Sequence, residues 1–146
     1  IAGATVFGHF ITRTAMPMQL ANWVSTLDVS PAVIMLIIIA FWFFLGCFID
    51  AMPIVVLLVP ILLPIITSLG YDLIWFAVVV VALSMVAVVT PPVGVNAYVV
   101  KGILEDVPLT TIFKGIFPFL IPFAIGIALI IAFPSLSTFL TEFITY

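Results

Sequence analysis

Four long stretches of this 146-residue chain contain no charged residue. They span residues 29–49, 51–71, 73–100 and 115–141, and a helix needs about 20 apolar residues to cross a bilayer. Only 6% of the chain is charged and 66% is hydrophobic, whereas about 25% of a soluble domain is charged. A soluble fold would therefore lack polar groups for its surface. The sequence predicts an all-α integral membrane protein, and its few basic residues form no cluster that could bind nucleic acid.

The first predicted unit covers residues 1–30. Residues 1–11 are apolar but too short to span, and no basic segment precedes them, so they do not resemble a signal peptide. We interpret them as the end of a truncated membrane helix, and we expect the chain to be the C-terminal part of a longer protein. His9 and Arg13 would mark the membrane surface, where a single histidine is more typical of a surface residue than of a ligand. Apolar residues at helical spacing between 16 and 27, with Trp23 among them, then predict a short amphipathic helix in the interface.

Residues 31–69 predict a helical hairpin. Two apolar arms, 31–47 and 53–69, flank a tip that contains Gly46, Cys47 and Asp50. The arms lie at the short end of the length that can span, so either two full passes or a re-entrant hairpin fits them. Two prolines in the second arm, Pro60 and Pro64, are expected to kink it.

Residues 70–104 predict a discontinuous helix. The sequence TPPVGVN at 90–96 interrupts an otherwise apolar segment, and two adjacent prolines followed by a glycine cannot continue a regular helix. No charge follows until Lys101, so the break lies at membrane depth, where irregular backbone is tolerated only if protein or a polar cavity surrounds it. We expect one half-helix to end near Val89 and the next to start near Val95.

The last predicted unit, residues 105–146, comprises a connector, a final transmembrane helix and a C-terminal tail. Lys101 and Lys114 lie on one side of the membrane in this scheme and Arg13 on the other. The excess of positive charge places the 101–114 loop in the cytoplasm.

The break is the strongest candidate for a functional site. A half-helix that ends near Val89 presents carbonyls that suit a sodium ion, and one that starts near Val95 presents N–H groups that suit an anion. Thr90 adds a hydroxyl, Asn96 an amide, and Gly94 allows a ligand to approach the backbone. The alternative is a kink that serves packing alone.

Asp50 is the second candidate, because a charge placed inside the membrane usually faces a cavity or a partner. It would lie near the site in a re-entrant hairpin and at the surface if both arms cross the membrane. Gly46 could either line the site or serve close helix packing. The sequence carries no motif of an enzyme, no metal-binding cluster and a single cysteine, which is typical of a small apolar packing residue.

Several of these segments together resemble the C-terminal part of the large membrane subunit of tripartite ATP-independent periplasmic (TRAP) transporters. The resemblance covers nearly the whole chain, and its most specific part is the TPPVGVN sequence. The other matching segments include VFGHF at 6–10, GCFID at 46–50, LGYD at 69–72 and DVPL at 106–109.

The resemblance implies a fragment of an inverted-repeat, elevator-type secondary transporter in the bacterial inner membrane. It implies sodium-coupled import of organic acids, of the C4-dicarboxylate or sugar-acid type, with a small membrane subunit and a periplasmic binding protein as partners. No cofactor is expected apart from sodium as the coupling ion. The expected substrate-binding residues are Thr90, Pro91, Pro92, Gly94, Val95 and Asn96. The expected ion-binding residues are Gly46, Asp50, Val89, Thr90 and Gly94.

One departure from the family pattern concerns an acidic residue that many relatives carry about five positions before this motif. Ser84 and Met85 occupy that place here. Two other functions stay open: a single-component divalent-anion symporter of related fold, whose Ser-Asn-Thr hairpin signature is absent, and a structural membrane subunit without a transport site.

Overall fold

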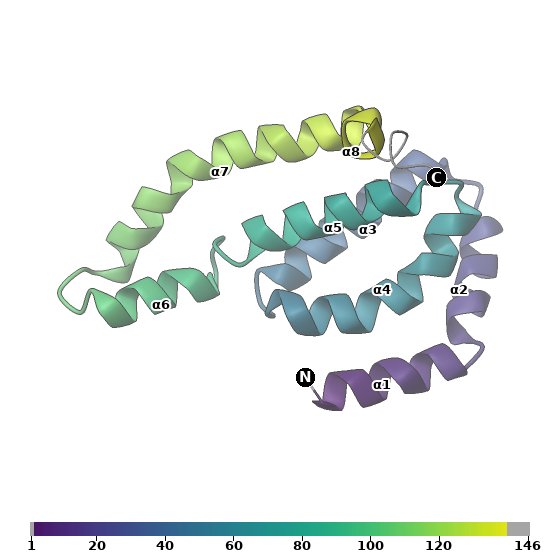
Figure 1. Ribbon diagram of the computed structural model, residues 1–146, viewed down its shortest axis with the longest axis horizontal. Coiled ribbons are helices and arrows are strands. Elements are labelled where there is room, and N and C mark those ends of the chain that lie inside the picture. The colour runs from purple at the N-terminus through teal and green to yellow at the C-terminus, as the bar shows by residue number, and fades with distance from the viewer. Residues whose placement is uncertain (1, 140–146) are drawn as a thin grey trace.

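The structure, a computed structural model, describes residues 2–139 of the chain. All regular elements in this range are helices, which confirms the expected all-α class (Figure 1). Ile1 and residues 140–146, which end the predicted C-terminal tail, lie outside the described residues. The helices are α1 (Ala2–Arg13), α2 (Met16–Ser25), α3 (Pro31–Gly46), α4 (Ala51–Ser68), α5 (Leu73–Ala87), α6 (Val95–Ile103), α7 (Leu109–Ala132) and α8 (Ser135–Thr138).

Local sequence signals explain where several helices begin. Asp72 caps α5, because its carboxylate Oδ1 accepts a hydrogen bond of 2.8 Å from the backbone N–H of Trp75. Pro31 occupies the first turn of α3, where the N–H that proline lacks would have no helical partner. The discontinuous helix is present as α5 and α6, and α5 ends at Ala87, two residues before the expected Val89.

The helices differ in whether they are long enough to cross a membrane. By length and composition α4 and α7 qualify, with 18 and 24 residues. The 16 residues of α3 and the 15 of α5 reach only about 24 and 23 Å at 1.5 Å per residue, which is shorter than a hydrocarbon core of about 30 Å.

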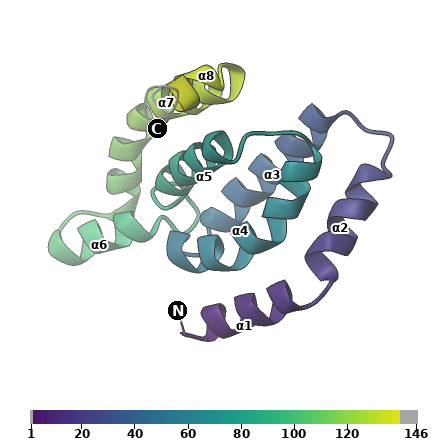
Figure 2. The same ribbon diagram turned by 45° about the vertical axis from the view of Figure 1, so that its right-hand side comes forward.

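The two arms of the hairpin pack against different neighbours. Residues 47–50 connect α3 to α4, and α3 then lies along α5, whereas α4 lies against α1 and α2 (Figures 1 and 2). The buried core runs through α2, α3, α4 and α5, and its largest fully buried side chains are those of Trp42, Ile66, Trp75 and Val79. The N–H of the Trp75 indole donates to the Ile130 carbonyl over 2.8 Å and so ties α5 to α7.

Much of the exterior of the molecule is apolar. Side chains such as those of Ile37, Met85 and Phe119 are more than half exposed, and α7 buries none of its residues within the described chain. Exposed apolar surface of this extent is unfavourable in water but matches lipid tails. The structure thus agrees with a membrane environment.

The core generates a stability prediction. Ile66→Ala removes a side chain that is 0% exposed and leaves a cavity, so it should lower the free energy of unfolding by about 2 to 5 kcal/mol. Ile37→Ala, at a position that is 61% exposed, is the matched control and should change it by well under 1 kcal/mol. Reversible unfolding in mixed micelles measures both. Equal losses would contradict the packing described here.

Candidate functional site

The tip of the hairpin lies directly against the end of α5. Gly46, the last residue of α3, and Ala87, the last residue of α5, are both buried. A methyl group added at Gly46 would place its carbon 2.5 Å from the Ala87 Cβ, a distance that no real pair of such atoms adopts. The absent side chain of Gly46 therefore allows the two helix ends to touch. The contact places the hairpin tip at the end of the half-helix that precedes the break.

A hydrogen bond fixes the same two helices one turn earlier. The Nε1–H of Trp42 on α3 donates to Oγ of Ser84 on α5 over 3.0 Å. Trp42 is 1% exposed and Ser84 6%, and within the described chain Ser84 is the polar side chain that the core buries. Ser84 and Met85 occupy the place where many relatives carry an acidic residue. Ser84 is buried and bonded to Trp42, whereas Met85 points outward and is 65% exposed.

The break itself depends on a glycine and on the start of α7. Gly94 precedes α6 with φ 54° and ψ 63°, the left-handed region that L-residues with side chains adopt rarely. A Cβ at this position would also lie 2.8 Å and 3.1 Å from two ring carbons of Phe113 on α7. Both the backbone conformation and the space require glycine, so α7 covers this side of the break closely.

Some backbone groups of the break are paired within it. The N–H of Asn96 donates to the Val88 carbonyl over 3.3 Å, which joins the two half-helices. The Thr90 hydroxyl donates to the Val86 carbonyl over 2.7 Å, so its proton is engaged while its oxygen lone pairs stay free to accept. The N–H groups of Ala97 and Tyr98 donate to the Gly94 carbonyl.

Other backbone groups of the break have no partner within the described residues. The carbonyls of residues 89–93 accept no hydrogen bond there, and the N–H groups of Val93, Gly94 and Val95 donate none. Backbone polar groups in an apolar region must be satisfied by protein, water or a ligand. The break therefore offers carbonyl oxygens that could bind a cation and N–H groups that could bind an anion. The Val88 carbonyl is not among them, because it accepts the hydrogen bond from Asn96.

Asp50 acts as a helix cap in this structure. Its Oδ1 accepts a hydrogen bond of 2.8 Å from the N–H of Ala51 at the start of α4, and the side chain is exposed. No interaction of the described residues joins its carboxylate to the break. The structure thus places Asp50 on the hairpin tip, four residues after Gly46, with a local structural role.

The cavity beside Thr90 is apolar. It has a volume of about 310 Å³ and lies between α3, α5 and α7, and apart from Thr90 it is lined by apolar side chains, among them Phe43, Leu83 and Ile127. It does not offer polar contacts to a carboxylate. The unpaired backbone groups of the break, and not this cavity, are the chemically suitable contacts for an anion.

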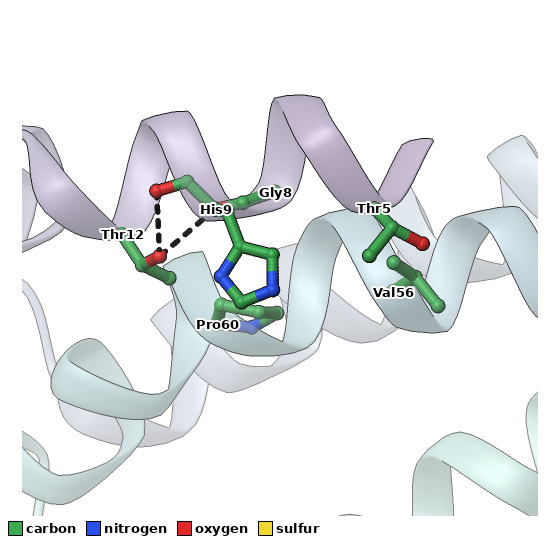
Figure 3. Close-up of a pocket in the computed structure, with 6 residues that line it drawn as sticks. All are labelled: Thr5, Gly8, His9, Thr12, Val56 and Pro60. Carbon is green, nitrogen blue, oxygen red and sulfur yellow. Dashed lines mark hydrogen bonds between the residues drawn. The ribbon is translucent and has the colours of Figure 1, made fainter. Parts of the chain in front are cut away.

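A second polar region, which the sequence analysis missed, lies between α1 and α4. Figure 3 shows the His9 ring over Pro60, in a pocket of about 230 Å³ that Thr5, Gly8, Thr12 and Val56 also line. Proline at position 60 cannot donate the helical hydrogen bond to the Val56 carbonyl, and a Cβ at Gly8 would lie 3.2 Å from that oxygen. The Thr12 hydroxyl donates to the carbonyls of Gly8 and His9, each over 3.0 Å. The sequence around Gly8 and His9 did not predict their contact with α4, because Val56 and Pro60 lie about 50 residues further along the chain.

The family model and the individual relatives that match this chain all point to the same family. The family described as the DctM component of the tripartite ATP-independent periplasmic transporter matches residues 1–136. A sialic acid TRAP transporter large permease of Vibrio cholerae is 36% identical over 97% of this chain, which covers 33% of that protein. A C4-dicarboxylate TRAP large permease of Pseudomonas aeruginosa is 29% identical over 94% of the chain and 32% of that protein. A 2,3-diketo-L-gulonate TRAP large permease of Escherichia coli is 26% identical over 93% and 32%. The chain thus spans about a third of the length of these relatives.

The contact at the tip generates a prediction. Gly46→Ala should displace the tip from α5 and lower the free energy of unfolding by about 1 to 3 kcal/mol, because the new methyl group overlaps that of Ala87. Adding Ala87→Gly removes the overlap and should restore part of the loss. Gly102→Ala is the control, because nothing lies within 4 Å of its added carbon. A Gly46→Ala variant as stable as Gly102→Ala would contradict the close approach.

Proposed function

Because the chain belongs to the DctM family, the large permease component of TRAP transporters, we propose that it forms part of a sodium-coupled importer of organic acids. The family consists of transport permeases, and membership in it confirms the expectation that the chain is no enzyme. The membrane location of the chain follows from the same membership.

The observation that carries the proposal is a set of backbone groups between residues 89 and 95 that have no partner within the described residues. They follow closely after Ala87, which contacts Gly46 of the hairpin tip. Carbonyl oxygens at the end of a half-helix suit a sodium ion, and N–H groups at the start of the next suit a carboxylate. In this scheme the carbonyls of Val89 and Thr90 and the tip around Gly46 hold the ion. The N–H groups of Gly94 and Val95 and the Asn96 amide hold the substrate, and Pro91 and Pro92 keep the helix open between the two.

The names of three relatives support the proposed substrate class. Sialic acid, C4-dicarboxylates and 2,3-diketo-L-gulonate, the substrates named for three relatives, all carry a carboxylate. A site that binds one carboxylate through backbone N–H groups would serve each of them. We therefore assign organic acids of the sugar-acid or dicarboxylate type to this permease.

The architecture and the partners belong to the same proposal. The short α3 and α5, about 24 and 23 Å long, support a re-entrant hairpin and a discontinuous helix, the second of two inverted repeats of an elevator-type transporter. The complete protein would be a multi-pass protein of the bacterial inner membrane. It would work with a small membrane subunit and a periplasmic binding protein that delivers the substrate.

Uptake into proteoliposomes tests this function. The complete transporter, with its small subunit and binding protein, should take up an organic acid when sodium is high outside and should fail to do so without a sodium gradient. Asn96→Ala should lower uptake roughly tenfold or more, because it removes a hydrogen bond to a charged group. The control, Asn22→Ala, changes an exposed asparagine on α2 and should leave uptake unchanged.

Two results would contradict the proposal. If uptake does not depend on sodium, sodium is not the coupling ion. If Asn96→Ala and Asn22→Ala give the same uptake, the substrate does not bind at the break.

A further inference from the structure

The geometry points to Trp42 and Ser84 as positioning residues, which hold the hairpin tip against the ion side of the break. This inference rests on the proposed function, since it concerns the affinity of the same site for sodium. Neither residue belongs to the proposed set of ligands. Their effect would act through the backbone that they place.

The first support is the isolation of this polar pair. Trp42 and Ser84 lie 42 residues apart in the chain, and their side chains form a buried hydrogen bond of 3.0 Å between α3 and α5. The surrounding core is apolar, so neither the indole N–H nor the hydroxyl oxygen has another described partner there. A buried polar group without its partner is costly, so only one register of α3 along α5 satisfies both groups.

The second support is the position of the pair relative to the site. Trp42 lies four residues before Gly46, and Ser84 lies three residues before Ala87, so both contacts occupy the same faces of the two helices on successive turns. The Gly46–Ala87 contact fixes how closely the helices approach, but a glycine facing a methyl group has no directional preference. The hydrogen bond supplies the direction, because a slip along the axis would break it.

The third support is the lack of any other such bond between the hairpin and α5. In the described chain, the side-chain hydrogen bond that joins them is that of Trp42 and Ser84. The adjacent arm α4 packs mainly on α1 and α2, which do not carry the break. Among these contacts the pair is therefore the one whose direction sets the position of the tip relative to the break.

The test measures sodium affinity apart from stability. In the complete transporter, Trp42→Phe and Ser84→Ala should each raise the sodium concentration for half-maximal uptake roughly three- to tenfold, the scale of one interhelical hydrogen bond in a membrane. The maximal rate should change less than the sodium affinity. The double variant should be no weaker in sodium affinity than either single variant, because all three lack the same bond.

Trp75→Phe is the matched control. It also removes a buried indole hydrogen bond, the one of 2.8 Å to the Ile130 carbonyl, but it lies at the start of α5, far along the helix from the break. It should lower thermal stability and leave the sodium affinity unchanged. If Trp42→Phe and Ser84→Ala lower stability as Trp75→Phe does, and leave the sodium affinity within about twofold, the pair has only a structural role.

A distance measurement separates a failure of this inference from a failure of the proposed function. Spin labels at Ile49→Cys on the tip and Val99→Cys on α6, both exposed positions, are introduced together with Cys47→Ala. The distance distribution should be narrow with the native pair, broad with Ser84→Ala, and narrow with Trp75→Phe. This result is independent of transport. A distribution that Ser84→Ala leaves unchanged would overturn the positioning role even in a protein without sodium-dependent uptake.

Discussion

A helix that is interrupted inside an apolar environment must satisfy the polar groups of its backbone. The sequence TPPVGVN removes two N–H donors and opens the chain between Ala87 and Val95. The N–H of Asn96 pairs with the Val88 carbonyl and closes part of the gap. Within the described residues the carbonyls of residues 89–93 accept no hydrogen bond, so they include the backbone groups that we propose as ion ligands.

Two glycines allow neighbouring helices to surround this segment. Gly46 brings the hairpin tip against Ala87, and Gly94 takes a left-handed conformation under the Phe113 ring. The core behind them, centred on Trp42, Trp75 and Val79, holds α3 and α5 as a support for the break. The chain needs few polar side chains, because an outer face that contacts lipid tails requires none.

The sequence predicted the helical class and the interruption between α5 and α6, because charge-free windows and the Pro-Pro-x-Gly pattern are local signals. It did not reveal the Trp42–Ser84 bond, the Gly46–Ala87 contact or the His9 pocket over Pro60. In segments as uniformly apolar as 31–46 and 73–87, periodicity does not show which face meets which neighbour. The sequence also did not show that Asp50 caps α4; its role in ion binding stays a prediction.

We propose that a sodium ion binds the carbonyls of the break that have no partner within the described residues. Structures of the complete transporter, determined once in sodium and once in potassium, would show whether the ion is there. We expect an ion coordinated by the carbonyls of Val89 and Thr90 and by the tip around Gly46, present in sodium and absent in potassium. Carbonyls that are bonded to another segment of the protein in both salts, with no ion between them, would contradict it.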